Sequence, residues 1–196
     1  MSTKERILDV TAELFRRHGY NGTGLKQIVA SANAPFGSIY HFFPGGKEEL
    51  GEAVVRRAGA MYYELVEAIW TANPDPVEGL RDSFSGAAAT LIETDYIDLC
   101  PIGTVALEMS STSEPLRRAT ADVFEMWIDR AATRFIEAGV PASRARALAI
   151  QVNLLIQGAF MFARATRSTE AVEAAGEAAV ALFEEALGPR RAPAGP

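Results

Sequence analysis

The ten prolines of this 196-residue chain divide it into long proline-free stretches, and that division constrains the fold more than any other feature. Within those stretches the apolar residues recur every three or four positions, which is the spacing of an amphipathic helix and not the alternation of a strand. Proline breaks or kinks a helix interior, so the prolines mark expected helix ends. The sequence therefore predicts an all-α protein.

The composition is that of a folded domain, with 48% apolar residues, 22% charged residues and a formal net charge of -6. Cys100 is the single cysteine, so no internal disulfide can form. The first residues are charged and amphipathic and contain no secretory signal, which predicts a cytoplasmic protein. Residues 148–163 are nearly all apolar, but the run is shorter than the roughly 20 residues that span a membrane and includes amide side chains. We expect a buried helix there and no membrane partner.

Capping signals predict where the helices begin and end. Ser2 and Glu5 have the spacing of a capping box, and Gly19 is expected to stop the first helix. A short helix is predicted from Thr23, as its N-cap, to residue 32, and Pro35 is placed in the first turn of a helix that carries residues 36–43. The remaining predicted helices cover residues 47–70, 76–91, 102–110, 113 to a stop at 139, 142–165, and 169–187.

The charge is unevenly distributed along the chain. Residues 1–47 contain six Lys or Arg against three acidic residues, a net charge of +3 that leaves -9 for the rest. A basic segment on an acidic protein favours a local nucleic-acid interface over general attraction to nucleic acid.

Residues 23–43 have the spacing of two short helices joined by a tight turn. The turn residue is Asn33, and asparagine tolerates the left-handed conformation that such a turn requires. Ile39 and Phe43 can anchor one side of the second helix. Its other side is small and hydrogen-bonding, formed by Gly37, Ser38, Tyr40 and His41. This pattern predicts a DNA-binding helix-turn-helix, although Tyr40 and Phe42 are equally compatible with a role as core aromatics and His41 with plain exposure.

Three runs of sequence then carry a family resemblance, namely GTGLKQIV at residues 22–29, GSIYHFF at residues 37–43 and KEEL at residues 47–50. Together with Ala34-Pro35 and Pro44-Gly45-Gly46, they resemble the N-terminal signature of TetR family transcriptional regulators, and the LmrA/YxaF-like subgroup in particular. The resemblance implies a three-helix helix-turn-helix DNA-binding domain over residues 1–46 and a helical effector-binding and dimerisation domain over residues 47–187. Residues 188–196 are rich in Gly and Pro and are expected to form a disordered tail.

The resemblance also implies which residues meet DNA. Thr23 and Lys26 are expected near phosphates, and Tyr40 and Lys47 on the DNA backbone. Residues expected at or near base edges are Pro35, Phe36, Ser38 and His41. Asn33 stands where the family usually has glycine, and Phe36 stands where a Lys or Arg is frequent, which argues against a charge-based contact at that position.

The C-terminal part gives weaker signals. The last two predicted helices are apolar or rich in small residues on several sides, and two-fold pairing into a four-helix bundle would bury both, as TetR-like proteins generally do. The resemblance also implies a pocket for a small apolar or aromatic effector in this part. Its candidate lining residues, each of which also suits plain core, are Leu107, Met109, Phe124, Trp127, Phe135, Asn153, Gln157 and Met161.

Enzymatic motifs are absent from the sequence. Its two histidines, His18 and His41, both lie in the predicted DNA-binding segment, and there is no HExxH or GxSxG pattern. We therefore expect no catalysis, no cofactor and no metal. The resemblance and the basic N-terminal segment lead us to expect a ligand-responsive repressor that binds a palindromic operator as a homodimer. Two alternatives remain open. One is a helical ligand-binding or enzymatic protein whose N-terminal helices do not grip DNA, and the other is an adaptor that uses its apolar C-terminal stripe for a protein partner.

Overall fold

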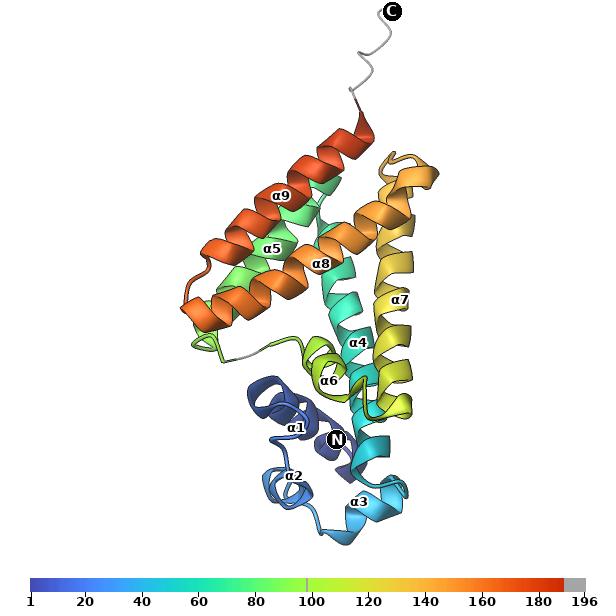
Figure 1. The fold of residues 1–196 in the computed structure, drawn as a ribbon, viewed down its shortest axis with the longest axis vertical. Helices are drawn as coiled ribbons and strands as arrows, with labels where there is room; N and C mark the ends of the chain where they lie inside the picture. Colours follow the sequence, from blue (N-terminus) through green and yellow to red (C-terminus); the bar gives the residue numbers. More distant parts are fainter. Residues whose placement is uncertain (98, 189–196) are drawn as a thin grey trace, which may run out of the picture. The chain divides into compact units, whose positions relative to one another are not determined.

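The structure, a computed structural model, describes residues 1–97 and 99–188. These residues form helices joined by turns, with no strand among them (Figure 1). The helices are α1 (Thr3–His18), α2 (Leu25–Ser31), α3 (Gly37–Phe42), α4 (Lys47–Ala72), α5 (Pro76–Glu93), α6 (Pro101–Met109), α7 (Glu114–Glu137), α8 (Ala142–Thr166) and α9 (Glu170–Leu187). The prediction of an all-α protein is confirmed. Residues 189–196 of the expected tail lie outside the described residues.

The chain divides into two compact units. The first contains Met1–Leu65 and Thr94–Glu125, and the second contains Val66–Glu93 and the chain from Met126 onward. Helices α4 and α7 are long enough to contribute to both units. The boundary predicted between residues 46 and 47 is a functional division and stays a prediction.

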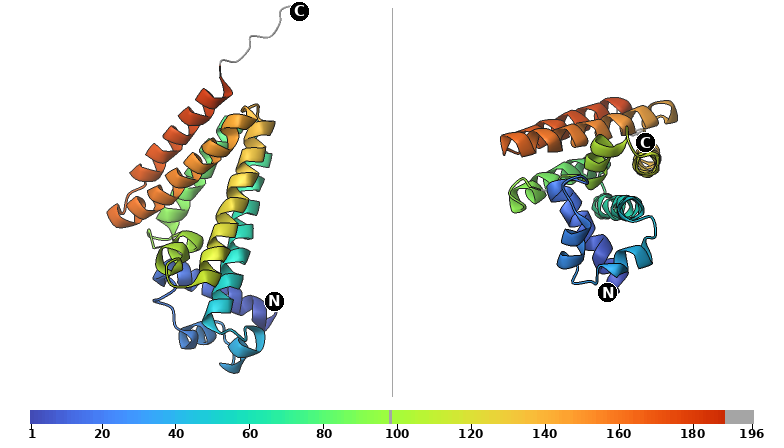
Figure 2. Two further views of the ribbon diagram at one scale, coloured as in Figure 1. Left: turned by 45° about the vertical axis from the view of Figure 1, so that its right-hand side comes forward. Right: turned by 60° about the horizontal axis from the view of Figure 1, so that its bottom comes forward.

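The first unit has its core where α1, α2 and α3 meet the start of α4 (Figure 2, right). Phe15, Ile28 and Ile39 are fully buried there, which accounts for the apolar spacing of these helices, and α2 and α3, with 7 and 6 residues, are too short to be stable alone. Helices α4 and α7 also approach closely in this unit. A side chain at Gly59 would overlap Val123, so the absence of a Cβ lets the two helices pack.

The second unit is held together by α9, which packs along both α5 and α8. Gly176 on α9 lies against Phe84 on α5, where an added Cβ would approach the Phe84 Cβ at 2.9 Å and the ring at 3.2 Å. Trp70, Phe135 and Phe183 form a buried aromatic cluster with ring centroids 5.2 to 6.1 Å apart. These rings join α4, α7 and α9 into one core.

Most capping predictions are confirmed. The Ser2 hydroxyl accepts the Glu5 N–H at 3.2 Å while the Glu5 carboxylate accepts the Ser2 N–H, which completes the capping box. The prediction that Thr23 caps α2 is wrong. Helix α2 begins at Leu25 with Gly24 as N-cap, because the Thr23 hydroxyl donates back to the Gly19 carbonyl at 2.7 Å. The prediction that Pro35 lies in the first turn of the next helix is also wrong, because α3 begins at Gly37 with Phe36 as N-cap, so Pro35 precedes the helix, and Phe43 follows its last residue.

Candidate nucleic-acid interface

The turn between α2 and α3 has the conformation predicted from its asparagine. Asn33 has φ +47° and lies in the left-handed region. The Ala34 N–H donates to the Val29 carbonyl at 3.0 Å and the Asn33 N–H donates to the Ala30 carbonyl at 3.2 Å. This pair of bonds is a Schellman motif, which ends α2 and redirects the chain sharply into α3.

Arg6 supports the same turn from α1. Its Nε donates to the Ala32 carbonyl at 3.2 Å, and that carbonyl belongs to the residue that caps the C-terminus of α2. A cation at this end of a helix also suits the helix dipole. Arg6 is one of the six basic residues in the charge count of residues 1–47, and in the structure its guanidinium fixes the end of α2.

Helix α3 buries one side and exposes the other. Ile39 and Phe43 are buried, whereas Phe36 and Tyr40 are 45% and 51% exposed and His41 is exposed. The Phe36 and Tyr40 rings lie on the exposed side with centroids 6.1 Å apart. Tyr40 is therefore not a core aromatic. The exposed surface offers one phenol, one imidazole and an apolar ring, groups that can contact phosphates, base edges and thymine methyls.

The eight residues expected to meet DNA differ in exposure. Thr23 is fully buried, and Ser38 and Lys47 are half-buried. The exposed ones are Lys26, Pro35, Phe36, Tyr40 and His41. Since the Thr23 hydroxyl bonds to Gly19 and its N–H bonds to the Tyr20 carbonyl, Thr23 shapes the loop before α2.

Lys47 is the first residue of α4, and its ammonium turns toward the protein. Its Nζ donates to the Tyr20 carbonyl at 2.7 Å and lies 4.2 Å from the centroid of the Tyr20 ring. Burial lowers the pKa of Lys47 from its ordinary value, while the charge of Glu108 acts in the opposite direction. Burial likewise raises the pKa of Tyr20, with a smaller contribution from Glu48.

Glu108 on α6 also contacts the loop between α1 and α2. Its carboxylate accepts the Asn21 N–H at 2.7 Å. The next helix is tied to the same unit by Ser113, whose hydroxyl donates to Glu48 at 2.6 Å. No sequence signal pointed to Glu108, because 87 residues separate it from Asn21.

The eight candidate effector residues divide between the two units. Leu107, Met109 and Phe124 lie in the first unit, where Leu107 is 84% exposed. The second unit holds Trp127, Phe135, Asn153, Gln157 and Met161. Phe135 belongs to the buried aromatic cluster, and Met161 is exposed at 57%. A lining role for these residues stays a prediction.

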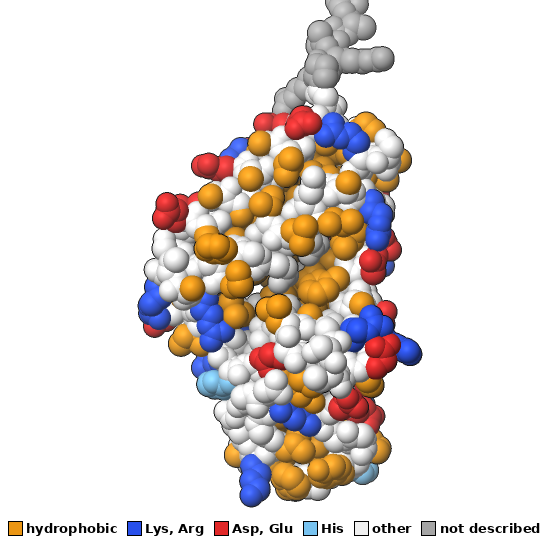
Figure 3. Space-filling model, viewed as in Figure 1, with side chains coloured by type: hydrophobic (Ala, Val, Ile, Leu, Met, Phe, Trp, Pro, Cys, Tyr) orange, Lys and Arg blue, Asp and Glu red, His pale blue; other side chains and the backbone are white. Residues whose placement is uncertain are grey.

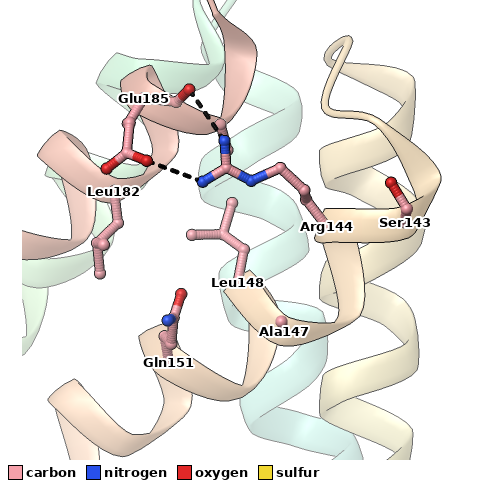
Figure 4. A pocket seen from close by; sticks show the side chains of 8 residues that line it. Ser143, Arg144, Ala147, Leu148, Gln151, Leu182 and Glu185 are labelled. Carbon is pink, nitrogen blue, oxygen red and sulfur yellow. Dashed lines mark hydrogen bonds and ion pairs between the residues drawn. The ribbon is translucent and has the colours of Figure 1, made fainter.

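A shallow pocket that the sequence did not suggest lies between the start of α8 and the end of α9 (Figure 4). It has a volume of about 360 Å³ and is lined by residues that include Ala147, Gln151 and Leu182. Arg144 closes one side by pairing with Glu185 at 3.0 Å. None of the eight candidate effector residues lines it.

Helix α8 is unusually apolar for a helix with an exposed side. By length and hydropathy alone it could cross a membrane, a property that the core helices of soluble proteins share. In its most apolar stretch of 18 residues, 22% is buried. Ala145, Leu148 and Ala159 are buried, whereas Leu154 and Phe162 are 67% and 59% exposed. One side of α8 thus belongs to the core of the second unit, and the other is uncovered in the single chain.

Comparison with known proteins accounts for both parts of the chain. Residues 7–54 match the family described as "Bacterial regulatory proteins, tetR family". Residues 76–178 match "Transcriptional regulator LmrA/YxaF-like, C-terminal domain". The chain is 36% identical over 159 residues to the uncharacterized HTH-type transcriptional regulator YxaF of Bacillus subtilis, covering 81% of this chain and 83% of YxaF. It is 32% identical over 167 residues to LmrA of the same organism, covering 85% and 89%.

A solved structure described as regulatory protein TetR from Rhodobacter sphaeroides has the same fold, with a TM-score of 0.82 and 22% identity over 91% of this chain and 97% of that one. At that identity the likeness concerns the fold, and the family follows from the sequence matches. Because two family descriptions cover most of the chain and YxaF matches along most of its own length, this chain belongs to the TetR family of bacterial DNA-binding transcriptional regulators.

Proposed function

We propose that this chain is a repressor that binds a palindromic operator as a homodimer in the cytoplasm and is released by a small apolar or aromatic effector. Regulators of the TetR family bind operator DNA and effector ligands, usually as dimers, and they are not enzymes. The observation that carries the proposal for this chain is that α3 buries Ile39 on one side, whereas Tyr40, His41 and the N-cap residue Phe36 are exposed.

The exposed side of α3 supports specific roles at the DNA. We assign the Tyr40 hydroxyl on α3 and the Lys26 ammonium on α2 to phosphates, contacts that fix register without reading sequence. Phe36 and His41 are placed at base edges, where the Phe36 ring suits the methyl group of thymine and the His41 imidazole can donate or accept a hydrogen bond. Pro35 and Ser38 complete this proposed base-reading surface.

The exposed sides of α8 and α9 support a dimer. On α8 the exposed residues include Gln151, Leu154 and Met161, whose spacings of three and seven positions put them on one side of the helix. On α9 the exposed residues include small ones at the same spacing, Ala174, Ala178 and Ala181. Hydrophobic side chains gather over these two helices in Figure 3, with acidic side chains along the outer edge of α9. A second copy with the same face would bury both stripes in a four-helix bundle.

The area of this face lies near the lower end for a specific interface. Helices α8 and α9 contain 25 and 18 residues. Side by side they offer a footprint of roughly 27 by 20 Å, or about 540 Å² before side-chain relief is added, against roughly 800 Å² per partner in a standard interface. The proposed partner would also cover part of the shallow pocket, since Ala147 and Gln151 belong to both.

Dimerisation and DNA binding can be tested together. The purified chain is used to select duplexes from a random-sequence pool, and the selected sites are sequenced. We expect an inverted repeat whose half-sites lie about one helical turn, roughly 34 Å, apart. Recovery of a single asymmetric half-site, or of no preferred sequence, would contradict a palindromic operator.

A charged substitution on the proposed dimer face tests the partner. Leu154→Arg is expected to convert the dimer to a monomer in sedimentation and to abolish tight binding to the selected duplex. The matched control is Ile92→Arg, which places the same charge on α5 at a residue that is 61% exposed. A dimeric Leu154→Arg variant would refute the α8–α9 interface, and a complex with a different protein would favour an adaptor.

Two substitutions on α3 test the individual roles. Tyr40→Phe removes a hydroxyl and is expected to weaken binding to all duplexes alike. Phe36→Ala is expected to change the preferred base at one position of each half-site. Unchanged affinity and unchanged preference in both variants would contradict the proposed roles.

The proposed effector acts by changing the population of DNA-competent dimers. A ligand shifts such an equilibrium only as far as it binds one conformation better than the other. Apolar and aromatic compounds are therefore screened for a concentration-dependent rise in Tm and for release of the selected duplex. Compounds that raise Tm without releasing DNA would refute the coupling.

A further inference from the structure

One peptide group in the loop between α1 and α2 is held by two opposite charges. The Lys47 Nζ donates to the Tyr20 carbonyl at 2.7 Å, and the Glu108 carboxylate accepts the Asn21 N–H at 2.7 Å. That carbonyl and that N–H belong to the same peptide bond. The two charged side chains come from the first residue of α4 and from α6.

The arrangement matches the dipole of the peptide group. A cation lies at its oxygen and an anion at its N–H, so both charges stabilise the same orientation. Hydrogen bonds with one charged partner are shorter and roughly twice as strong as neutral ones. The two contacts therefore resist rotation of the Tyr20–Asn21 peptide more than a pair of neutral contacts would.

The same peptide determines where α2 begins. The Tyr20 carbonyl also accepts the Thr23 N–H at 3.2 Å, and the Thr23 hydroxyl donates to the Gly19 carbonyl at 2.7 Å. Leu25, two residues later, is the first residue of α2. Fixing the peptide thus fixes the turn that leads into the helix-turn-helix.

Gly19 makes room for the Glu108 side chain. Its φ of +76° is a conformation that favours glycine, and a Cβ at this position would overlap the Glu108 carboxylate. The loop backbone and the α6 side chain therefore fit each other at two adjacent points, Gly19 and Asn21.

We infer that Lys47 and Glu108 are a pair of positioning residues for DNA binding that act through the Tyr20–Asn21 peptide. Lys47 serves the interface by holding this peptide and not by contacting a phosphate. Glu108 extends the DNA-binding machinery to α6, so that the placement of α2 depends on a helix distant in sequence from the helix-turn-helix.

A spectroscopic measurement tests the Glu108 contact without DNA. In ¹⁵N-labelled protein, Glu108→Ala is expected to move the amide proton of Asn21 upfield, because its charged acceptor is lost. Glu108→Gln keeps an oxygen acceptor and is expected to retain part of the shift. Glu64→Ala removes an exposed carboxylate from α4 and is expected to leave the Asn21 signal in place. An Asn21 signal unmoved by Glu108→Ala would overturn the proposal.

Salt dependence of binding separates positioning from phosphate contact. The probe is the duplex that the wild-type protein selects from a random pool. Lys47→Met and Glu108→Ala are each expected to lower affinity about tenfold for each DNA-binding domain of the dimer, the effect of losing one hydrogen bond to a charged group. The plot of log affinity against log salt should keep its slope in Lys47→Met, whereas Lys26→Met should reduce the slope by about 1.8 in a dimer.

The double variant gives a further criterion. Because both residues act on one peptide, Lys47→Met with Glu108→Ala should lose clearly less than the product of the two single effects. Glu108→Gln keeps an oxygen acceptor and should lose no more than about threefold for each DNA-binding domain, so it can replace Glu108→Ala in the single and double variants if Glu108→Ala unfolds. A slope that falls in Lys47→Met as it does in Lys26→Met would overturn the inference. A wild-type chain that selects no duplex would instead refute DNA binding itself, while the Asn21 shift would still test the pair.

Discussion

The binding of this protein to its operator should depend on salt less steeply than its count of basic residues suggests. Of the cations in the first 47 residues, Arg6 donates to the Ala32 carbonyl, Arg17 pairs with Glu13, and Lys47 donates to the Tyr20 carbonyl. Arg16 lies in the last turn of α1, where a cation suits the helix dipole. Lys26 is exposed, and Lys4 is exposed with its Nζ 5.6 Å from the centroid of the Phe43 ring, a contact that does not tie it to a carbonyl or carboxylate, so both are assigned to phosphates.

These contacts set the expected magnitude. Two phosphate-binding lysines in each DNA-binding domain give four in a dimer. Each neutralised phosphate contributes about -0.9 to the slope of log affinity against log salt, for a total of about -3.6. Affinity should then fall about 150-fold between 50 and 200 mM salt. If Lys47 also bound phosphate, six contacts would give a slope of about -5.4 and a loss of about 1,800-fold over the same range.

The measurement is a titration of the selected duplex by fluorescence anisotropy at four or more salt concentrations, with the dimer verified at each. Lys26→Met is the control, since it removes one exposed cation from each DNA-binding domain and should make the slope less steep, at about -1.8. A wild-type slope near -5.4, or a Lys26→Met slope equal to that of the wild type, would refute the assignment of cations to phosphates and to the protein.

Three further predictions concern stability. Asn33→Ala should lower the free energy of unfolding by about 1 kcal/mol in urea because φ is +47°, whereas Asn33→Gly should not, and equal losses would contradict the role of the left-handed turn. Gly59→Ala should cost about 1 to 3 kcal/mol and lower Tm because a Cβ there would overlap α7, whereas Gly86→Ala, with open space around it, should raise Tm. Hydrogen bonds from two arginines lower the pKa of Glu114 from 4.5 to about 2, so this carboxylate stabilises the fold above about pH 4.5 and loses that effect as pH falls toward 2. Carboxyl ¹³C titration should show this pKa and its rise in Arg118→Ala, and a wild-type value near 4.5 would contradict the pairing.

The features that sequence could predict are those determined by neighbouring residues. The capping box of Ser2 and Glu5, the Asn33 turn and the helix starting at Pro76 each depend on contacts within about five residues, and the structure has all three. The exception is Thr23. Its hydroxyl could accept an N–H at the start of α2 or donate to a preceding carbonyl, and it donates to the carbonyl of Gly19, the C-cap of α1. The residue type of Thr23 therefore predicts a local hydrogen bond of its hydroxyl but not which backbone group is the partner.

The features that sequence could not predict depend on partners distant in the chain. Residue type identifies Lys47 and Arg6 as cations, but their partners, the carbonyls of Tyr20 and Ala32, are backbone groups that carry no residue signature. Glu108 is similarly one acidic residue among 25 until α6 is placed beside the loop. A resemblance transfers the position of a residue, and the direction of its side chain follows only from the packed structure.

This distinction changes how the charge of the N-terminal segment should be interpreted. A net charge of +3 over residues 1–47 suggests electrostatic attraction, yet Arg6 and Lys47 have their charged groups on the protein's own carbonyls. The same cations therefore rigidify the DNA-binding domain that presents Phe36 and Tyr40. Because this domain has few phosphate contacts, a larger share of its binding energy comes from DNA shape and base-edge contacts, which depend on sequence. Discrimination between operator and random duplex should consequently persist as salt rises, even while both affinities fall, because base-edge contacts release no counterions.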